Sequence, residues 1–191
     1  MLHVKSSFAW LLFVLMISNE NGISADLDEI SSRQTKDFTN AQRTFQNEML
    51  TAHNNYRSRH CARALHLDEN LSRSAQNYAQ KLARDNNMVH SGMKGIGENL
   101  YMMTSSTKMT TIPGSKATKS WYDEIEKYNF GKPIFSSATG HFTQVVWKNS
   151  QKLGVGFALG NGGRSAFIVA QYSPPGNVQG AFAANVSPKQ C

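Results

Sequence analysis

The sequence predicts a single α+β domain in which helices pack on a small antiparallel sheet. Two observations carry this prediction. Apolar residues repeat with helical spacing in the first half of the chain, whereas two segments rich in Val, Phe and Ile, 152–159 and 165–173, follow one another near its end. The run Gly-Asn-Gly-Gly at 160–163 separates these two segments and is typical of a hairpin loop.

Residues 1–25 have the composition of a secretory signal peptide. Lys5 provides a positive charge, an apolar run covers residues 8–17, and small residues close the segment. This run is too short for a bilayer core, which takes about 20 residues, and a retained membrane anchor is the alternative interpretation. We therefore expect a secreted, extracellular protein with a flexible leader at 26–42 and one domain at 43–191.

The composition is basic. The sequence contains 20 Lys and Arg against 13 Asp and Glu, which gives a formal net charge of +7. Such a surface favours anionic partners, for example an anionic membrane surface or a sulfated glycan. The basic residues are scattered and the chain is expected outside the cell, so we do not expect it to bind nucleic acid.

Two amphipathic helices are expected before residue 90. The first begins near Phe45 and carries its apolar stripe at Phe45, Met49, Ala52 and Tyr56, with His53 and His60 on its flank. A connector at 61–67 follows. The second helix is capped by Asp68 or Asn70 and ends at the polar triplet 85–87.

Residues 102–114 are expected to form an irregular loop, because Ser, Thr, Pro and Gly surround its methionines. A third helix is expected over roughly 116–129, with a buried face at Trp121, Ile125 and Tyr128. At 100° per residue, Glu124 lies close to that face, where a carboxylate is costly without a partner. Glu124 is therefore expected to contact a positive or protonated group.

The segment 139–150 places a histidine at the mouth of a core segment. His141 stands between a glycine and an aromatic residue, ahead of the apolar run Val145, Val146 and Trp147. His90, Glu98 and Glu124 are the other acid–base residues that stand beside a glycine or in a buried segment. Their spacing alone predicts no metal site, because it lacks the close intervals of metal-binding motifs.

Two long motifs resemble the signatures of the CAP superfamily, also called the SCP domain, which comprises cysteine-rich secretory, antigen 5 and pathogenesis-related 1 proteins. These motifs are GHFTQVVWKNS at 140–150 and FIVAQYSPPGNV at 167–178. Further landmarks match in the expected order at His90-Ser91, GENL at 97–100 and WYDEI at 121–125. The chain has only two cysteines, and Ala170 stands where the second signature usually has cysteine. In this it resembles the Golgi-associated plant-pathogenesis-related branch of the family.

This resemblance implies a three-layer α-β-α sandwich with a central cleft. His90, Glu98, Glu124 and His141 match the family's cleft tetrad, in which two histidines bind zinc or another divalent cation. The corresponding metal ligands here are His90 and His141, and the glutamates would orient them. The alternative is a tetrad that only holds the layers together through hydrogen bonds.

The leading hypothesis is a secreted, non-enzymatic CAP-domain protein that binds a lipid or sterol. Its apolar lip would be formed by Tyr101, Met102, Met103 and Met109, because methionines give an adaptable surface; the alternative is that they fill gaps in the core. A hydrolase or peptidase is the second hypothesis, with a cleft histidine as base and Thr104, Ser105 or Ser106 as nucleophile, although no nucleophile signature occurs. The third hypothesis is an extracellular signalling or defence ligand that acts through a protein receptor.

Two further features depend on export. Cys61 and Cys191 are expected to form one disulfide across about 130 residues, and a free or intermolecularly paired Cys191 is the alternative. Asn70 and Asn185 each begin a glycosylation sequon.

Overall fold

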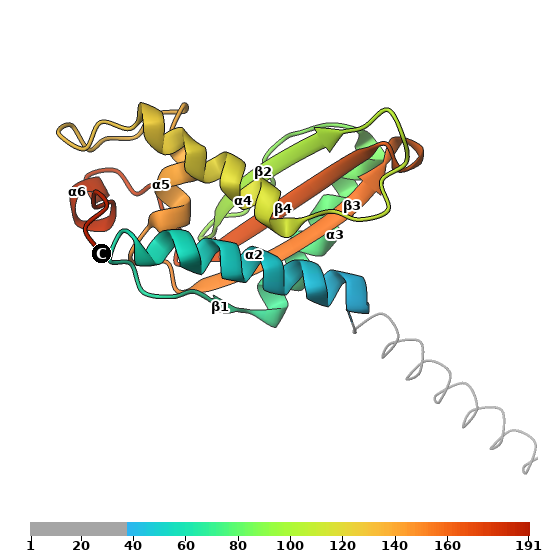
Figure 1. The fold of residues 1–191 in the computed structure, drawn as a ribbon, viewed down its shortest axis with the longest axis horizontal. Coiled ribbons are helices and arrows are strands. Elements are labelled where there is room, and N and C mark those ends of the chain that lie inside the picture. Colours follow the sequence, from blue (N-terminus) through green and yellow to red (C-terminus); the bar gives the residue numbers. More distant parts are fainter. Residues whose placement is uncertain (1–37) are drawn as a thin grey trace, which may run out of the picture. The chain divides into compact units, whose positions relative to one another are not determined.

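The computed structural model describes residues 38–191, in which a four-stranded sheet lies between layers of helices (Figure 1). The strands, in chain order, are β1 (His66–Leu67), β2 (Gly97–Thr104), β3 (Lys152–Gly160) and β4 (Ser165–Ser173). Their order across the sheet is β1-β3-β4-β2. The β3–β4 hairpin forms as expected, and residues Asn40–Cys191 make one compact unit. The predicted signal peptide and residues 26–37 of the leader lie outside the described residues.

The helices are α2 (Asn40–Ser58), α3 (Glu69–Asp85), α4 (Gly114–Asp123), the 3₁₀ turn η1 (Glu124–Lys127), α5 (Gly140–Val146), the 3₁₀ turn η2 (Asn161–Gly163) and α6 (Phe182–Asn185). The predicted leader at 26–42 is wrong at its end, because α2 already begins at Asn40. Its first turns lack the apolar stripe but are held to α3 by Arg43, which binds both carboxylate oxygens of Glu69 at 2.8 and 2.9 Å.

Helix α3 covers one face of the sheet at very close range. Its small residues pack against Leu100, Phe167 and Val169 from β2 and β4. A Cβ atom at Gly156 would lie only 2.3 Å from the Cα atom of Gln76 in α3, so this position in β3 accepts no side chain. Asp68 caps α3, since its Oδ1 accepts from the N–H of Leu71 at 3.0 Å.

Helices α2, α4 and α5 cover the opposite face and enclose the main core, which confirms the predicted α-β-α layers (Figure 1). The sheet differs from the expectation in two ways. The short strand β1 pairs parallel with β3, so the sheet is mixed. Residues 102–104 complete β2 and are not part of a loop. The third helix is also shorter than expected, because α4 ends at Asp123 and η1 follows.

Arg57 joins the last turn of α2 to the end of α5. Its guanidinium is fully buried and donates to four carbonyl oxygens at 2.8–3.0 Å, those of Arg63, Val145, Trp147 and Ser150. No carboxylate pairs with it within residues 38–191. Burial lowers the pKa of Arg57 to about 10, so the group still carries a positive charge at neutral pH.

The disulfide between Cys61 and Cys191 is present, with Cα atoms 5.5 Å apart. It confirms the intrachain pairing over the alternatives and fixes the end of the chain beside the end of α2. Among the described helices, none has both the length and the apolar character needed to cross a bilayer.

Candidate functional site

The first part of the site is a pair formed by Glu124 and His141. Oε1 of Glu124 accepts from Nδ1 of His141 at 2.7 Å. Oε2 accepts from the backbone N–H groups of His141 and Phe142 at 3.0 and 3.1 Å. Glu124, at the start of η1, thus satisfies the exposed N–H groups at the first turn of α5. These three hydrogen bonds provide the partners that a carboxylate needs near the buried face of α4 and η1, as predicted for Glu124.

The second part is a pair formed by His90 and Glu98 at the start of β2. Nδ1 of His90 donates to Oε1 of Glu98 at 3.0 Å, and the N–H of Ser91 donates to the same oxygen at 2.8 Å. Nε2 of Gln171, from the neighbouring strand β4, donates to the other oxygen at 3.2 Å. The Glu98 side chain is 7% exposed, whereas that of His90 is 62% exposed. The carboxylate is therefore fixed and the imidazole faces solvent.

Both pairs present the imidazole in the same way. A carboxylate only accepts hydrogen bonds, so Nδ1 of each histidine carries the proton and Nε2 is left to bind something else. Within residues 38–191, neither Nε2 atom has a hydrogen-bond partner. This is the arrangement of metal-binding histidines, which pass their second N–H to a carboxylate.

The structure does not merge the two pairs into one cluster of four contacting side chains. Among the described residues no group of three or more His, Cys, Asp and Glu side chains has metal-binding geometry. Asn99 connects the pairs, because it follows Glu98 on β2 and its amide donates to the backbone oxygen of His141 at 3.1 Å. The amide also donates to Oη of Tyr172 at 3.2 Å.

A buried polar chain continues from Asn99 into the core. The hydroxyl of Tyr172 bonds to Nε2 of His53 at 2.8 Å, and Nδ1 of His53 donates to the carbonyl of Met49 at 2.7 Å. Burial lowers the pKa of His53 to about 4 and raises the pKa of Tyr172 above its usual range. His53 is therefore neutral at neutral pH and accepts the Tyr172 proton. Asn99 and Tyr172 were not among the predicted site residues; the signal available in the sequence was a polar Asn directly before the apolar residues 100–103.

The residues predicted to form a lipid-binding loop fall on two faces of the sheet. Cross-strand register places Tyr101 opposite Ile168 and Met103 opposite Ala166, on the main-core face. Met102 pairs with Phe167 and is exposed on the α3 face. Alternate residues of a strand point to opposite sides, so one surface does not contain all four predicted residues. Met109 lies beyond β2 and packs against the main core.

An apolar recess does lie near these residues, between the start of α2, β3 and the segment after Met109. It has a volume of about 230 Å³ and is lined by Ala41, Thr44, Phe45, Glu48, Thr110, Thr111, Ile112, Phe157 and Leu159. A hollow of about 460 Å³ along α2 adjoins it through Thr44 and Glu48. Phe157 and Leu159 lie in register with Ile168 and Ala166, so the recess continues the face of Tyr101 and Met103.

The nucleophiles proposed for a hydrolase lie at the opposite end of β2 from Glu98, the partner of His90. Thr104 ends β2 and Ser105 and Ser106 follow it, whereas Glu98 stands at the beginning of the strand. At about 3.3 Å per residue, Thr104 and Glu98 are roughly 20 Å apart. This separation excludes a triad of Thr104 with His90 and Glu98.

The two sequons have different surroundings. Asn70 is exposed in the first turn of α3. Asn185 is only 2% exposed, its amide donates to the carbonyl of Ala181 at 2.9 Å, and its oxygen accepts from the N–H of Asn149 at 2.9 Å. Asn185 is therefore buried and hydrogen-bonded in the folded chain, whereas Asn70 is accessible to solvent.

The fold and the site define a class: an α-β-α domain with two carboxylate-oriented histidines, one in the segment before β2 and one in the first turn of α5. Residues 50–172 match the CAP family, described as the cysteine-rich secretory protein family. The chain belongs to the CAP family. A human relative, Golgi-associated plant pathogenesis-related protein 1, is 46% identical over 78% of this chain and 96% of its own length.

Two further proteins share less sequence with this chain. Secreted protein RBT4 of Candida albicans is 36% identical over 78% of this chain, which spans only 40% of that protein's length. Among solved structures, that of BmVAL-1 is similar with a TM-score of 0.67 and 26% identity, and the match covers 81% of this chain and 86% of the other. These similarities agree with the expected α+β fold.

Proposed function

We propose that this CAP-domain protein is a secreted, non-enzymatic binding protein that holds a lipid or sterol in the apolar recess between α2 and β3. The observation that supports this best is the lining of the recess. Phe45, Ile112, Phe157 and Leu159 provide its apolar walls, and threonine hydroxyls at its edge can bond to a polar end group.

The size of the recess suits part of such a ligand. Binding sites for small molecules typically have volumes of about 300–1,000 Å³. The recess of about 230 Å³ reaches that range only together with the adjoining hollow of about 460 Å³. A rigid ring system or one acyl chain would occupy the apolar part, and its polar end would lie toward Thr44 and Glu48. Met103 and Met109 pack behind this region and can adapt to the ligand's shape.

Competition between protein and vesicles tests the proposal. Purified protein is mixed with vesicles that contain radiolabelled sterol or fatty acid, and the label in the protein fraction is measured. Leu159→Asp places a charge at the recess and should reduce the transferred label about tenfold or more. Met102→Asp is the matched control, because Met102 and Leu159 are both 43% exposed but lie on opposite faces of the sheet. No transfer by the unmodified protein, or equal losses in both variants, would contradict the proposal.

We also propose that His90 and His141 bind a divalent cation such as zinc. The support is chemical: two imidazoles whose Nδ1 atoms are bound by Glu98 and Glu124 leave Nε2 to coordinate. Zinc sites usually have three or four protein ligands, so a site with two histidines would be completed by water and would be weak. A bound cation would supply a positive, Lewis-acidic charge at these imidazoles.

Zinc titration by calorimetry on chelator-treated protein tests this second proposal. Binding in the micromolar range that is lost in His90→Ala/His141→Ala would support it. Equal zinc binding by the variant would refute the proposal. So would a wild type that binds no zinc but is more stable than the variant, because the two pairs would then have a structural role only.

Secretion is supported by the signal-peptide composition and by the name of the Candida relative, whereas the human relative is named for the Golgi. Expression of the full chain in cultured cells, followed by immunoblots of medium and cell lysate, distinguishes release from retention.

A further inference from the structure

A hollow lined by basic side chains lies at the end of α2, away from both His/Glu pairs and the apolar recess. It has a volume of about 620 Å³ and is lined by Cys61, Arg63, Ala64, His66, Lys148, Asn149 and Gln151. We call it the basic pocket. It shares no lining residue with the apolar recess. Within the described residues, no acidic side chain lines it.

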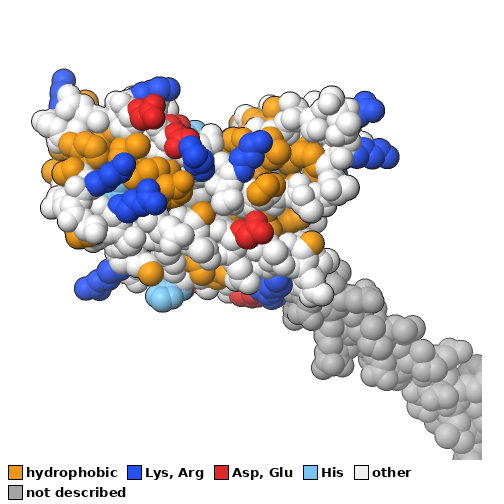
Figure 2. Space-filling view, viewed as in Figure 1, with side chains coloured by type: hydrophobic (Ala, Val, Ile, Leu, Met, Phe, Trp, Pro, Cys, Tyr) orange, Lys and Arg blue, Asp and Glu red, His pale blue; other side chains and the backbone are white. Residues whose placement is uncertain are grey.

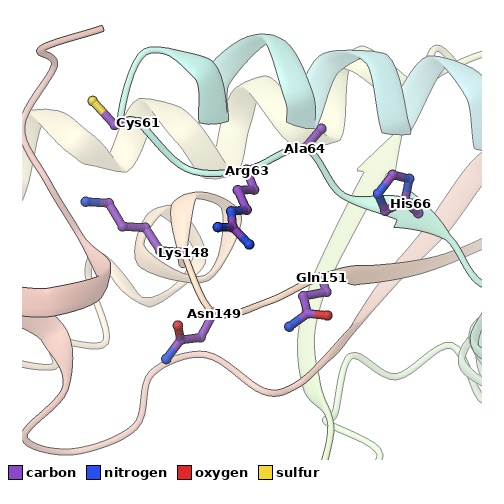
Figure 3. A pocket seen from close by; sticks show the side chains of 7 residues that line it. All are labelled: Cys61, Arg63, Ala64, His66, Lys148, Asn149 and Gln151. Carbon is purple, nitrogen blue, oxygen red and sulfur yellow. The ribbon is translucent and has the colours of Figure 1, made fainter.

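The pocket is distinguished by its shape, since positive charge alone is common on this protein. On the face drawn in Figure 2, lysine and arginine side chains are spread among exposed apolar side chains. In the basic pocket, by contrast, Arg63, His66 and Lys148 border one hollow. Figure 3 shows the Arg63 side chain projecting into the hollow between Lys148 and Gln151, with Asn149 across from it.

The donors of the pocket are available to a ligand. The Arg63 guanidinium pairs with no carboxylate in residues 38–191. The Lys148 ammonium donates to Oγ of Ser187 at 2.6 Å, which leaves two of its three N–H groups. The nearby acid, Asp68, is engaged by Lys152 at 3.0 Å.

A buried positive charge lies behind the pocket walls. The carbonyls bound by Arg57 belong to Arg63, Trp147 and Ser150 among others, so its guanidinium sits between the two segments that carry the lining residues. Buried charges in proteins are normally paired with an opposite charge, but Arg57 is held by carbonyl dipoles only. Its net positive charge is therefore not cancelled by a carboxylate and adds to the attraction for an anion in the pocket.

We propose that the basic pocket binds a phosphate or sulfate ester carried on a hydroxylated ring. Arg63 offers the planar pair of donors that fits two oxyanion oxygens, and Lys148 adds a point charge. Asn149 and Gln151 have both amide donors and carbonyl acceptors, which suit ring hydroxyls. The pocket volume of about 620 Å³ is larger than a single oxyanion group needs, so the ring that carries the ester also fits in the pocket. Two sources carry this chemistry, a sulfated sugar and the headgroup of an inositol phospholipid.

The test uses two soluble probes, a sulfated heparin-derived disaccharide and inositol 1,4-bisphosphate, on the full folded domain with its disulfide intact. Binding is followed through chemical shifts of the side-chain amides of Asn149 and Gln151. We expect shifts with at least one probe and weaker binding as NaCl increases. The tighter probe identifies the source. Binding of neither probe at millimolar concentration, or binding without shifts at these amides, would overturn the proposal.

Variants separate the pocket from the general charge of the protein. Arg63→Gln/Lys148→Gln should weaken binding about tenfold or more, since charge-assisted hydrogen bonds are lost. Lys108→Gln/Arg164→Gln removes the same charge near the opposite end of β3, where Lys108 lies against Gly163, and should retain binding. Equal weakening in both variants would show attraction by net charge alone and refute the site. Arg63→Lys/Lys148→Arg keeps the charges and should restore most of the affinity.

Discussion

The buried histidine His53 should make this domain sensitive to mild acid. Its ordinary pKa is 6.5, and burial lowers the pKa in the folded chain to about 4. Between these two values the unfolded chain binds a proton that the folded chain does not. The contribution of neutral His53 to the free energy of unfolding is therefore fully present above pH 6.5, the pKa of histidine in the unfolded chain. This contribution is lost as the pH falls toward 4.

The magnitude follows from the difference between the two pKa values. Each unit corresponds to about 1.36 kcal/mol, so the full contribution is about 3 kcal/mol, and about 2 kcal/mol is lost between pH 7.5 and pH 5. His60 acts in the same direction, because burial also lowers its pKa; its Nδ1 donates to the carbonyl of Ser187 and its Nε2 contacts the hydroxyl of Tyr122. The effect of His53 must therefore be measured as a difference from a variant.

Urea unfolding at pH 7.5, 6.5, 5.5 and 5 of the wild type and His53→Gln gives that difference. Glutamine can still donate to the Met49 carbonyl and accept from Tyr172, but it does not titrate. We expect His53→Gln to lose about 2 kcal/mol less than the wild type over this range, at an unchanged denaturant slope. The same pH dependence in both proteins would refute the reasoning. So would an NMR titration in which the His53 ring gains its proton above pH 6.

Two other substitutions test the packing. Arg57→Met removes four hydrogen bonds from buried carbonyls and should lower the free energy of unfolding by about 3–5 kcal/mol, whereas Arg59→Met at an exposed site should cost under about 1 kcal/mol. Similar urea midpoints for the two variants would contradict this role of Arg57. Gly156→Ala forces a Cβ atom against the backbone of Gln76 and should cost about 3 kcal/mol or more. An unchanged midpoint would show that α3 can move away from β3.

The elements that sequence predicted well are those whose stability is local. Asp68 and the polar triplet after Arg84 marked both ends of α3, and the Gly-rich loop marked the β3–β4 hairpin. The inward position of Glu124 also followed from its place on a helical face. Its partner did not, because the contact to His141 spans 17 residues and depends on how η1 meets α5.

The elements that sequence missed are stabilised from a distance. The segment of α5 contains β-branched residues, which have low helix propensity, so its sequence indicated a buried segment but no helix. It is helical because Glu124 binds N–H groups at its start and Arg57 binds carbonyls at its end. The end of strand β2 was not predicted, because its sequence does not show the usual pattern of apolar residues inside and polar residues outside. Asn99 is polar but buried, and Met102 is apolar but exposed. Asn99 is tolerated inside because His141 and Tyr172 accept its hydrogen bonds.

The disulfide has a mechanical consequence. A force applied between the start of α2 and Cys191 passes through the sulfur bridge to Cys61, so the 130-residue loop that holds the sheet, α3, α4 and α5 carries none of it. Only α2 lies in the loaded path. At about 3.5 Å per residue, roughly 450 Å of chain stays out of reach until the bridge is reduced. While the disulfide is intact, the molecule under tension should therefore lengthen by little more than the extension gained when α2 unfolds.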